Sequence, residues 1–155
     1  MTDRTRLAVL GSPIAHSKSP AIQTAAYRVL GLPWTYEAIR VDEAGLPGFL
    51  DGLGPEWRGL SLTMPLKRDV VPRLATRSPL VDLVGGANTV RVDDDGLHGW
   101  NTDVHGIVAA LREGGVVAPR RVLLLGSGAT AASVLAALAE LGGPEVRIAA
   151  RTLAN

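Results

Sequence analysis

Residues 121–131 read RVLLLGSGATA, a nearly continuous apolar run that ends at two glycines and continues into an alanine-rich stretch. The apolar run predicts a buried strand, residues 129–141 predict a helix, and residues 146–150 predict a second strand, which together make a βαβ unit. The loop matches G-x-G-x-x-A, a motif that lets a dinucleotide pyrophosphate approach the backbone at a helix N-terminus. A plain tight turn would use the same glycines, but the strand-loop-helix context favours phosphate binding.

About 20 residues after the glycines, an acidic side chain would bind the ribose 2′-hydroxyl of NAD. The sequence has Ala149-Ala150-Arg151-Thr152 at this place. An arginine there can pair with a 2′-phosphate and stack on adenine, whereas a solvated surface arginine is the simpler alternative. Because the carboxylate is missing, the sequence favours NADP as the cofactor.

Upstream of this unit, strands and helices alternate, and a hairpin is expected around Asp93-Asp94-Asp95-Gly96. We therefore expect an α/β fold, with a mainly parallel mixed sheet flanked by helices. The amphipathic helix predicted for 103–112 marks the boundary between one domain over residues 1–102 and a second over residues 103–155. The other elements expected are strands at 7–10, 34–41, 59–62, 87–92 and 97–100, helices at 20–30 and 43–53, and a short helical stretch after Pro65.

The amino-acid composition argues against several classes of partner and site. Sixteen basic and fifteen acidic residues give a net charge of +1 without a basic stripe, which disfavours nucleic acid and anionic membranes. The absence of cysteine excludes disulfides and thiolate chemistry. No apolar stretch approaches the roughly 18 residues of a membrane span, so a cytoplasmic location is expected. His16, His98 and His105 show no ligand spacing with acidic partners, so we interpret them as surface or satisfied histidines and expect no metal site.

Two serines precede the helix expected at residues 20–30. Ser19 before Pro20 is typical of an N-cap followed by proline at the first helical position. Capping does not explain Ser17, and paired hydroxyls near a helix start could also bind a substrate carboxylate. From these residues alone, the cap is favoured.

Lys67 and Asp103 each stand near a predicted helix start, after Thr63-Met64-Pro65-Leu66 and after Asn101-Thr102 respectively. Capping and a surface lysine explain both segments. Alternatively, the two side chains share one cleft, where the carboxylate orients the amine for proton exchange with a hydroxyl that becomes a carbonyl. Asn88, at the start of the hairpin, is either an ordinary turn residue or an amide in the cleft that binds the hydroxyls of a polyol.

Five ordered segments, spread over almost the whole chain, resemble the shikimate dehydrogenase family. The segments are 11–20 (GSPIAHSKSP), 62–67 (LTMPLK), 86–89 (GANT), 99–106 (GWNTDVHG), and the glycine loop 125–131 together with 150–152 (ART). The loop departs from the family pattern Gly-Ala-Gly-Gly-Ala, since this chain has Gly126-Ser127-Gly128-Ala129-Thr130. The two glycines that matter for the backbone are kept.

The resemblance implies an NADP-dependent oxidoreductase of the shikimate pathway, and so of chorismate and aromatic amino-acid biosynthesis. It implies reversible reduction of 3-dehydroshikimate to shikimate, with Lys67 and Asp103 as the catalytic proton-transfer pair. The only partner implied is the small-molecule substrate, and a homodimer is left open. The implied substrate-binding residues are Ser17, Ser19, Thr63, Lys67, Asn88 and Asp103, and the implied cofactor-binding residues are Gly126, Ser127, Gly128, Ala129, Thr130, Arg151 and Thr152.

The family's chains are substantially longer, and a mononucleotide-binding half needs three strands where two are expected here. The second domain is therefore expected to be a truncated Rossmann-like βαβ unit, and the 155-residue chain to have little activity alone. Two alternatives stay open: a relative that acts on quinate or aminoshikimate, and a non-catalytic shikimate-binding regulatory module. Arg151 disfavours an NAD-preferring quinate enzyme, and the presence of both Lys67 and Asp103 disfavours the module.

Overall fold

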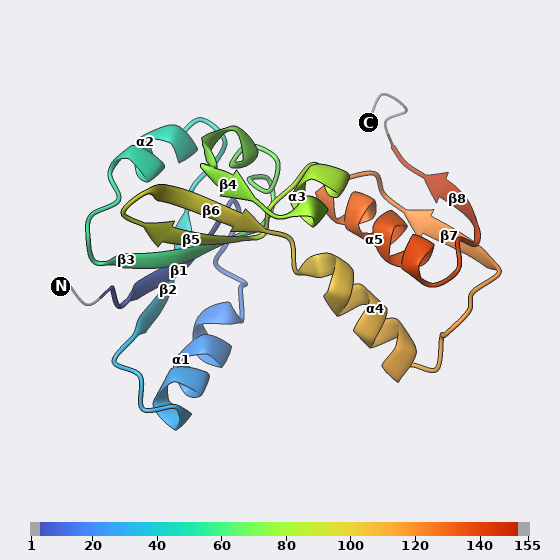
Figure 1. The fold of residues 1–155 in the computed structure, drawn as a ribbon, viewed down its shortest axis with the longest axis horizontal. Helices are drawn as coiled ribbons and strands as arrows, with labels where there is room; N and C mark the ends of the chain where they lie inside the picture. The colour runs from blue at the N-terminus through green and yellow to red at the C-terminus, as the bar shows by residue number, and fades with distance from the viewer. Residues whose placement is uncertain (1–3, 152–155) are drawn as a thin grey trace.

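The computed structural model describes residues 4–151, which form eight strands, five α-helices and one 3-10 turn (Figure 1). The strands are β1 (Arg6–Gly11), β2 (Thr35–Arg40), β3 (Trp57–Leu62), β4 (Thr76–Arg77), β5 (Thr89–Asp93), β6 (Gly96–Trp100), β7 (Arg121–Leu125) and β8 (Glu145–Ala149). The helices are α1 (Ser19–Val29), α2 (Leu46–Asp51), α3 (Pro79–Val84), α4 (Asp103–Glu113) and α5 (Ala129–Glu140), and the 3-10 turn is η1 (Val71–Arg73).

The first sheet has six strands in the order β2-β1-β3-β5-β6-β4, and β7 pairs in parallel with β8 in a second sheet. β1 is parallel to β2 and β3, β5 is antiparallel to β3 and β6, and β4 is parallel to β6. The expected α/β fold with a mainly parallel mixed sheet is confirmed. Because β3 and β6 both run opposite to β5, the carboxyl ends of β1, β3 and β6 lie at one edge of the sheet.

Buried side chains of the first sheet alternate between its two faces. Ala8 and Leu10 of β1 are fully buried in the larger core, which α2 covers with Leu46 and Leu50. Val9, between them, is buried on the opposite face, as expected for successive residues of a strand. In Figure 1, α2 and α1 lie on opposite sides of this sheet. The core thus fixes the orientation of β1, and with it the loop that follows.

Three helices form a second core between the two sheets. Val84 at the end of α3, Val104 and Val108 of α4, and Ala137 and Leu141 in and after α5 make one buried cluster. The amphipathic helix expected at 103–112 is therefore confirmed, and its apolar face contacts α5. Figure 1 shows α3 and α4 between the lobe of β1–β6 and the lobe of β7, β8 and α5. Within residues 4–151, no helix has the length and apolar character needed to cross a membrane.

The short helical stretch expected after Pro65 is present only as turns up to residue 70 and the 3-10 turn η1, and no α-helix forms there. Leu66 and Val70 are fully buried, and the Val70 N–H donates to the Leu66 carbonyl, so the helical spacing lasts for a single turn. Pro72 has no N–H to donate to the Arg68 carbonyl, which explains why the α-helical hydrogen-bond pattern does not continue.

The sequence-based prediction omits two short elements. α3 starts at Pro79, and Gly85 ends it with a positive φ of 66°, which are ordinary start and stop signals on an unusually short helix. β4 has two residues and forms only by pairing with His98 and Gly99 of β6. Its formation depends on partners more than 20 residues away, which local patterns do not encode.

Both tyrosines of the chain lie where α1 meets β2. Tyr27 contacts Trp34 edge-on, with ring centroids 5.3 Å apart, and its ring also packs near that of Tyr36. Burial raises the pKa of Tyr27. Burial also raises the pKa of Tyr36, and the hydrogen bond from its hydroxyl to Ser61 Oγ at 2.7 Å opposes this shift without cancelling it.

We therefore predict that both phenols of the folded protein ionise above the ordinary pKa of 10.0. Since the unfolded chain releases these protons at lower pH, the stability contributed by the neutral phenols is present below pH 10 and is lost as the pH rises through their folded-state pKa values. The measurement is a spectrophotometric titration of phenolate in native and denatured protein. A common midpoint in both states would contradict the buried position of the tyrosines.

Candidate active site

Polar segments from three loops meet at the edge where β1, β3 and β6 end. The Thr63 N–H donates to the Leu10 carbonyl and the Ser12 N–H donates to the Met64 carbonyl, which joins the loops after β1 and β3. This close approach requires a glycine at position 11, since a Cβ there would lie 2.5 Å from Thr63 Cγ2 and 2.8 Å from the Met64 oxygen. The parallel arrangement of the strands is therefore what brings distant motifs together.

Lys67 and Asp103 form an ion pair at this edge. Lys67 lies in the turns after β3, Asp103 is the first residue of α4, and Lys67 Nζ is 2.7 Å from Asp103 Oδ2. The side chains are only 14% and 22% exposed, so water screens the two charges less than it would at an open surface. The structure brings together the two residues that the sequence suggested as a pair, although only Lys67 is among the residues that line the neighbouring cleft.

Asn88 holds the other oxygen of the same carboxylate. Its Nδ2 donates to Asp103 Oδ1 at 2.7 Å and to Thr102 Oγ1 at 2.9 Å, while its Oδ1 accepts the Thr102 N–H at 3.0 Å. The Asn88 backbone lies between two strands, because its N–H donates to Trp100 and its carbonyl accepts the Leu62 N–H. Each oxygen of Asp103 therefore has its own donor, and the carboxylate is fixed in direction.

The start of α4 differs in detail from the expected cap. Thr102 occupies the N-cap position and its side chain makes no capping bond. Asn101 Oδ1 instead accepts the N–H groups of Asp103 at 3.0 Å and Val104 at 3.4 Å. The side-chain oxygen that satisfies the helix N-terminus comes from one residue earlier than the N-cap.

The expected N-cap role of Ser19 is wrong. Ser19 is the first residue of α1, Lys18 is at the N-cap position, and Ser17 Oγ accepts the Ser19 N–H at 3.3 Å. The Ser17 hydroxyl thus takes the local backbone bond that Ser19 was expected to make. Both serines follow β1 and are partly buried near the edge where Thr63 lies, but among residues 4–151 no hydrogen bond joins either serine to Lys67 or Asp103.

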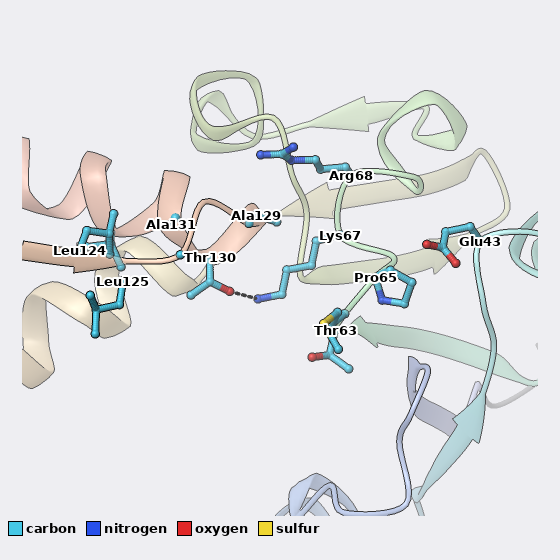
Figure 2. Close-up of a pocket in the computed structure, with 14 residues that line it drawn as sticks. Glu43, Thr63, Pro65, Lys67, Arg68, Leu124, Leu125, Ala129, Thr130 and Ala131 are labelled. Atoms are coloured by element: carbon cyan, nitrogen blue, oxygen red, sulfur yellow. Dashed lines mark hydrogen bonds between the residues drawn. The ribbon is translucent and has the colours of Figure 1, made fainter. Parts of the chain in front are cut away.

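A cleft of about 710 Å³ separates the Lys67 loop from the glycine loop. Figure 2 shows Lys67 extending across it toward Thr130 of α5, with Nζ 3.4 Å from Thr130 Oγ1. At this length the bond is weak. The residues that line the cleft are Glu43, Thr63, Met64, Pro65, Lys67, Arg68, Leu124, Leu125, Gly126, Gly128, Ala129, Thr130, Ala131 and Val134.

The glycine loop has the shape expected of a phosphate-binding turn. Gly126 has a positive φ of 103°, which favours glycine, and α5 begins at Ala129 immediately after Gly128. A Cβ on either glycine would meet nothing within 4 Å, so the space that a side chain would fill is open to an approaching ligand. Ser127, between the glycines, is not among the residues that line the cleft.

Arg151 follows β8 and is exposed, and it too is absent from the cleft lining. It stands next to Ala150 on the side of the second sheet where β7 ends in the glycine loop, since Leu125 pairs with Ala149. Thr152, the last residue predicted to bind a cofactor, lies outside the described residues.

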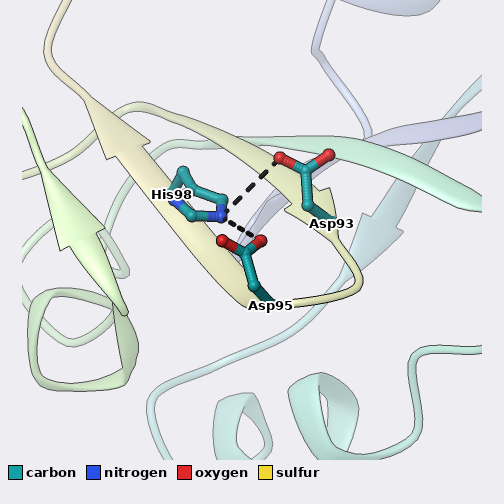
Figure 3. A group of neighbouring side chains, drawn as sticks. All are labelled: Asp93, Asp95 and His98. Atoms are coloured by element: carbon teal, nitrogen blue, oxygen red, sulfur yellow. Dashed lines mark hydrogen bonds and ion pairs between the residues drawn. The ribbon is translucent and has the colours of Figure 1, made fainter.

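The expectation that His98 shows no ligand spacing with acidic partners is wrong, because it lies in one group with Asp93 and Asp95, whereas its interpretation as a satisfied histidine is confirmed. His98 is buried, and its Nε2 lies 2.8 Å from Asp95 Oδ1 and 3.6 Å from Asp93 Oδ2 (Figure 3). Its Nδ1 lies 2.7 Å from Thr76 Oγ1. The hydrogen bond with His98 lowers the pKa of the exposed Asp95 carboxyl. Because the Arg91 guanidinium already pairs with Asp93 Oδ2, these contacts are explained as bonds that tie the hairpin turn to β4.

Sequence reasoning missed some residues that the structure brings to the site. Glu43 and Arg68 line the cleft although no motif marks them. Thr102 belongs to the capping segment before α4. Its bond with Asn88 joins residues 14 positions apart, which a local sequence pattern does not predict. Asn88, which the sequence offered as a candidate site residue, donates a hydrogen bond to Asp103.

Comparison with known proteins identifies relatives over the whole chain. The family model for the shikimate dehydrogenase substrate binding domain matches residues 9–90. A shikimate dehydrogenase (NADP(+)) of Geobacter metallireducens is 39% identical over 100% of this chain and 56% of its own length. Another, of Thermus thermophilus, is 41% identical over 88% of this chain and 52% of its own length. The chain spans about half the length of these curated relatives.

Solved structures of this group share the fold. Shikimate dehydrogenase of Mycobacterium tuberculosis is 44% identical with a TM-score of 0.85, over 97% of this chain and 57% of its own. The Thermus thermophilus enzyme, crystallised in complex with NADP(H) and shikimate, is 40% identical with a TM-score of 0.86, over 96% of this chain and 56% of its own. The ordered motifs, the matched domain and the shared fold agree that this chain belongs to the shikimate dehydrogenase family.

Proposed function

We propose that the protein containing this chain catalyses the reversible, NADPH-dependent reduction of 3-dehydroshikimate to shikimate. The observation that carries the proposal is the Lys67–Asp103 ion pair, whose lysine lines the cleft opposite the glycine loop. Relatives named shikimate dehydrogenase (NADP(+)), and one solved in complex with NADP(H) and shikimate, support the choice of substrate and cofactor. A module that only binds shikimate would not require an amine held beside a carboxylate.

Lys67 is the proposed proton donor and acceptor. Hydride transfer is the chemistry that a bound nicotinamide cofactor supplies. During reduction the substrate carbonyl oxygen becomes a hydroxyl and takes its proton from Lys67 Nζ, and during oxidation the hydroxyl returns a proton to the amine. An ammonium has three N–H groups. Lys67 uses two of them for Asp103 and Thr130, which leaves one for the substrate oxygen.

Asp103 and Asn88 orient the reacting groups. Asp103 fixes the direction of the Lys67 amine and, through its carboxylate, can accept a hydrogen bond from a substrate hydroxyl. Asn88 keeps that carboxylate in place and can itself contact a hydroxyl. We assign the carboxylate of the substrate to the hydroxyls of Ser17, Ser19 and Thr63, which follow β1 and β3 at the same edge of the sheet, with Ser19 at the start of α1.

The glycine loop is the proposed pyrophosphate site. The space beside Gly126 and Gly128 is free of side chains, and the first N–H groups of a helix such as α5 have no partner within the helix. Lys67 and Arg68 also place positive charge on the opposite wall of the cleft, which favours an anionic ligand. Arg151, exposed at the end of β8, is the proposed contact to the 2′-phosphate that distinguishes NADP from NAD.

The first test replaces the proposed proton donor. In the complete enzyme, Lys67→Ala is predicted to lower kcat about 100-fold or more while changing shikimate affinity little. Lys67→Arg keeps the charge but holds its proton too tightly to exchange it, so a similar loss is expected. Arg112→Ala, at an exposed position near the end of α4, is the control. Turnover is followed through the absorbance of the reduced cofactor, and an unchanged kcat in Lys67→Ala would remove Lys67 from the chemistry.

The second test addresses cofactor choice. Arg151→Ala is predicted to lower kcat/KM for NADP about 10- to 100-fold, because a charge-assisted contact to the 2′-phosphate is lost. Activity with NAD, which has no phosphate there, should change little. Arg147→Ala on β8 is a matched control, since its exposed guanidinium already pairs with Glu145. An equal loss with both cofactors would exclude Arg151 as the discriminating residue.

A further inference from the structure

We propose that Asn101 is a positioning residue of this active site, a buried amide that holds the backbones of both Asp103 and Lys67. This inference rests on the proposed function. Asn101 is only 4% exposed, which is unusual for an asparagine. A buried amide is costly unless its hydrogen-bonding groups have partners, so the partners of Asn101 show what it stabilises.

All four hydrogen-bonding positions of the Asn101 amide are used. Its Oδ1 accepts the N–H groups of Asp103 at 3.0 Å and Val104 at 3.4 Å. Its Nδ2 donates to the Gly86 carbonyl at 2.9 Å and to Ser133 Oγ at 3.3 Å. A backbone N–H can only donate and a carbonyl can only accept, so these partners leave a single orientation for the amide.

The oxygen side of the amide acts on Asp103. The first N–H groups of α4 have no acceptor within the helix, and Asn101 supplies one to the residue that carries the carboxylate. With its backbone held, Asp103 needs only its side-chain torsions to be fixed, and Lys67 and Asn88 fix them by taking one carboxylate oxygen each. The direction of the carboxylate therefore depends on the Asn101 oxygen.

The nitrogen side of the amide acts on Lys67 through one intervening loop. Gly86 accepts from Asn101, and the next residue, Ala87, donates its N–H to the Lys67 carbonyl at 2.8 Å. The packing is close, because a Cβ on Gly86 would lie 3.3 Å from the Lys67 oxygen. One side chain is thus bonded to the backbone of Asp103 and linked to that of Lys67 through Gly86 and Ala87.

The remaining bond connects this pair to α5. Ser133 is fully buried one turn after Ala129, where α5 leaves the glycine loop. At 3.3 Å this is among the longer bonds of the amide, and Asn101 would keep three partners without it. No other side chain of similar size offers both two acceptor and two donor positions, so the proposal applies to asparagine specifically.

The test uses graded substitutions in the complete enzyme. Asn101→Ala removes all four bonds, and we expect kcat to fall about 10- to 100-fold, with the KM for NADPH within about twofold of wild type. Asn101→Ser keeps an acceptor near the start of α4 and should recover part of the loss. Ser133→Ala removes only the bond to α5 and should keep kcat close to wild type. Melting temperatures and shikimate affinity are measured for every variant.

The control separates positioning from general destabilisation. Leu50→Ala on α2 removes a buried side chain remote from the ion pair and should lower the melting temperature without lowering kcat. Equal kcat losses in Leu50→Ala and Asn101→Ser at equal loss of stability would overturn the proposal, as would a wild-type kcat in Asn101→Ser and Asn101→Ala. A wild-type enzyme that neither binds nor oxidises shikimate would overturn the proposed function, and this inference with it.

Discussion

The ion pair between Lys67 and Asp103 is the contact on which the rest of the site depends. Two opposite charges that are mostly removed from water stabilise each other only when their geometry is good and their other hydrogen-bonding groups have partners. Here Nζ and Oδ2 are 2.7 Å apart, and Asn88 satisfies the second carboxylate oxygen. A lysine without this neighbour would have no fixed direction, and proton transfer requires a donor within hydrogen-bonding distance of the substrate.

The fold supplies that geometry through strand direction. The chain reverses once between β3 and β5 and again in the β5–β6 hairpin, so that β6 runs parallel to β1 and β3 and all three end at the same edge. Lys67 follows β3, and Asp103 follows β6 and begins α4. The second core, formed by α3, α4 and α5, then brings the glycine loop opposite Lys67. Substrate chemistry and cofactor binding are thus placed by two separate cores that share α3, since Val81 belongs to the first core and Val84 to the second.

Local patterns predicted the parts of the structure that local interactions determine. The βαβ unit, the hairpin around Asp93–Gly96 and the buried face of α4 are confirmed, because apolar periodicity and turn residues act over a few positions. The Lys67–Asp103 pair was only one of two interpretations, since 36 positions separate its members. What local patterns could not predict depends on distant contacts: β4 forms only by pairing with β6, and the bonds between Asn88 and Thr102 join two separate segments. Asp93, Asp95 and His98 are close in sequence, but whether their side chains meet depends on the hairpin turn between β5 and β6.

A double-mutant cycle on Lys67 and Asp103 tests the account most directly. Lys67→Ala, Asp103→Asn and the combined variant are compared by kcat for shikimate oxidation in the complete enzyme. If the amine and the carboxylate act as one proton-transfer unit, the double variant loses no more than the more damaged single variant. Losses that multiply would show that the two residues act independently, and would contradict the central role given to their contact.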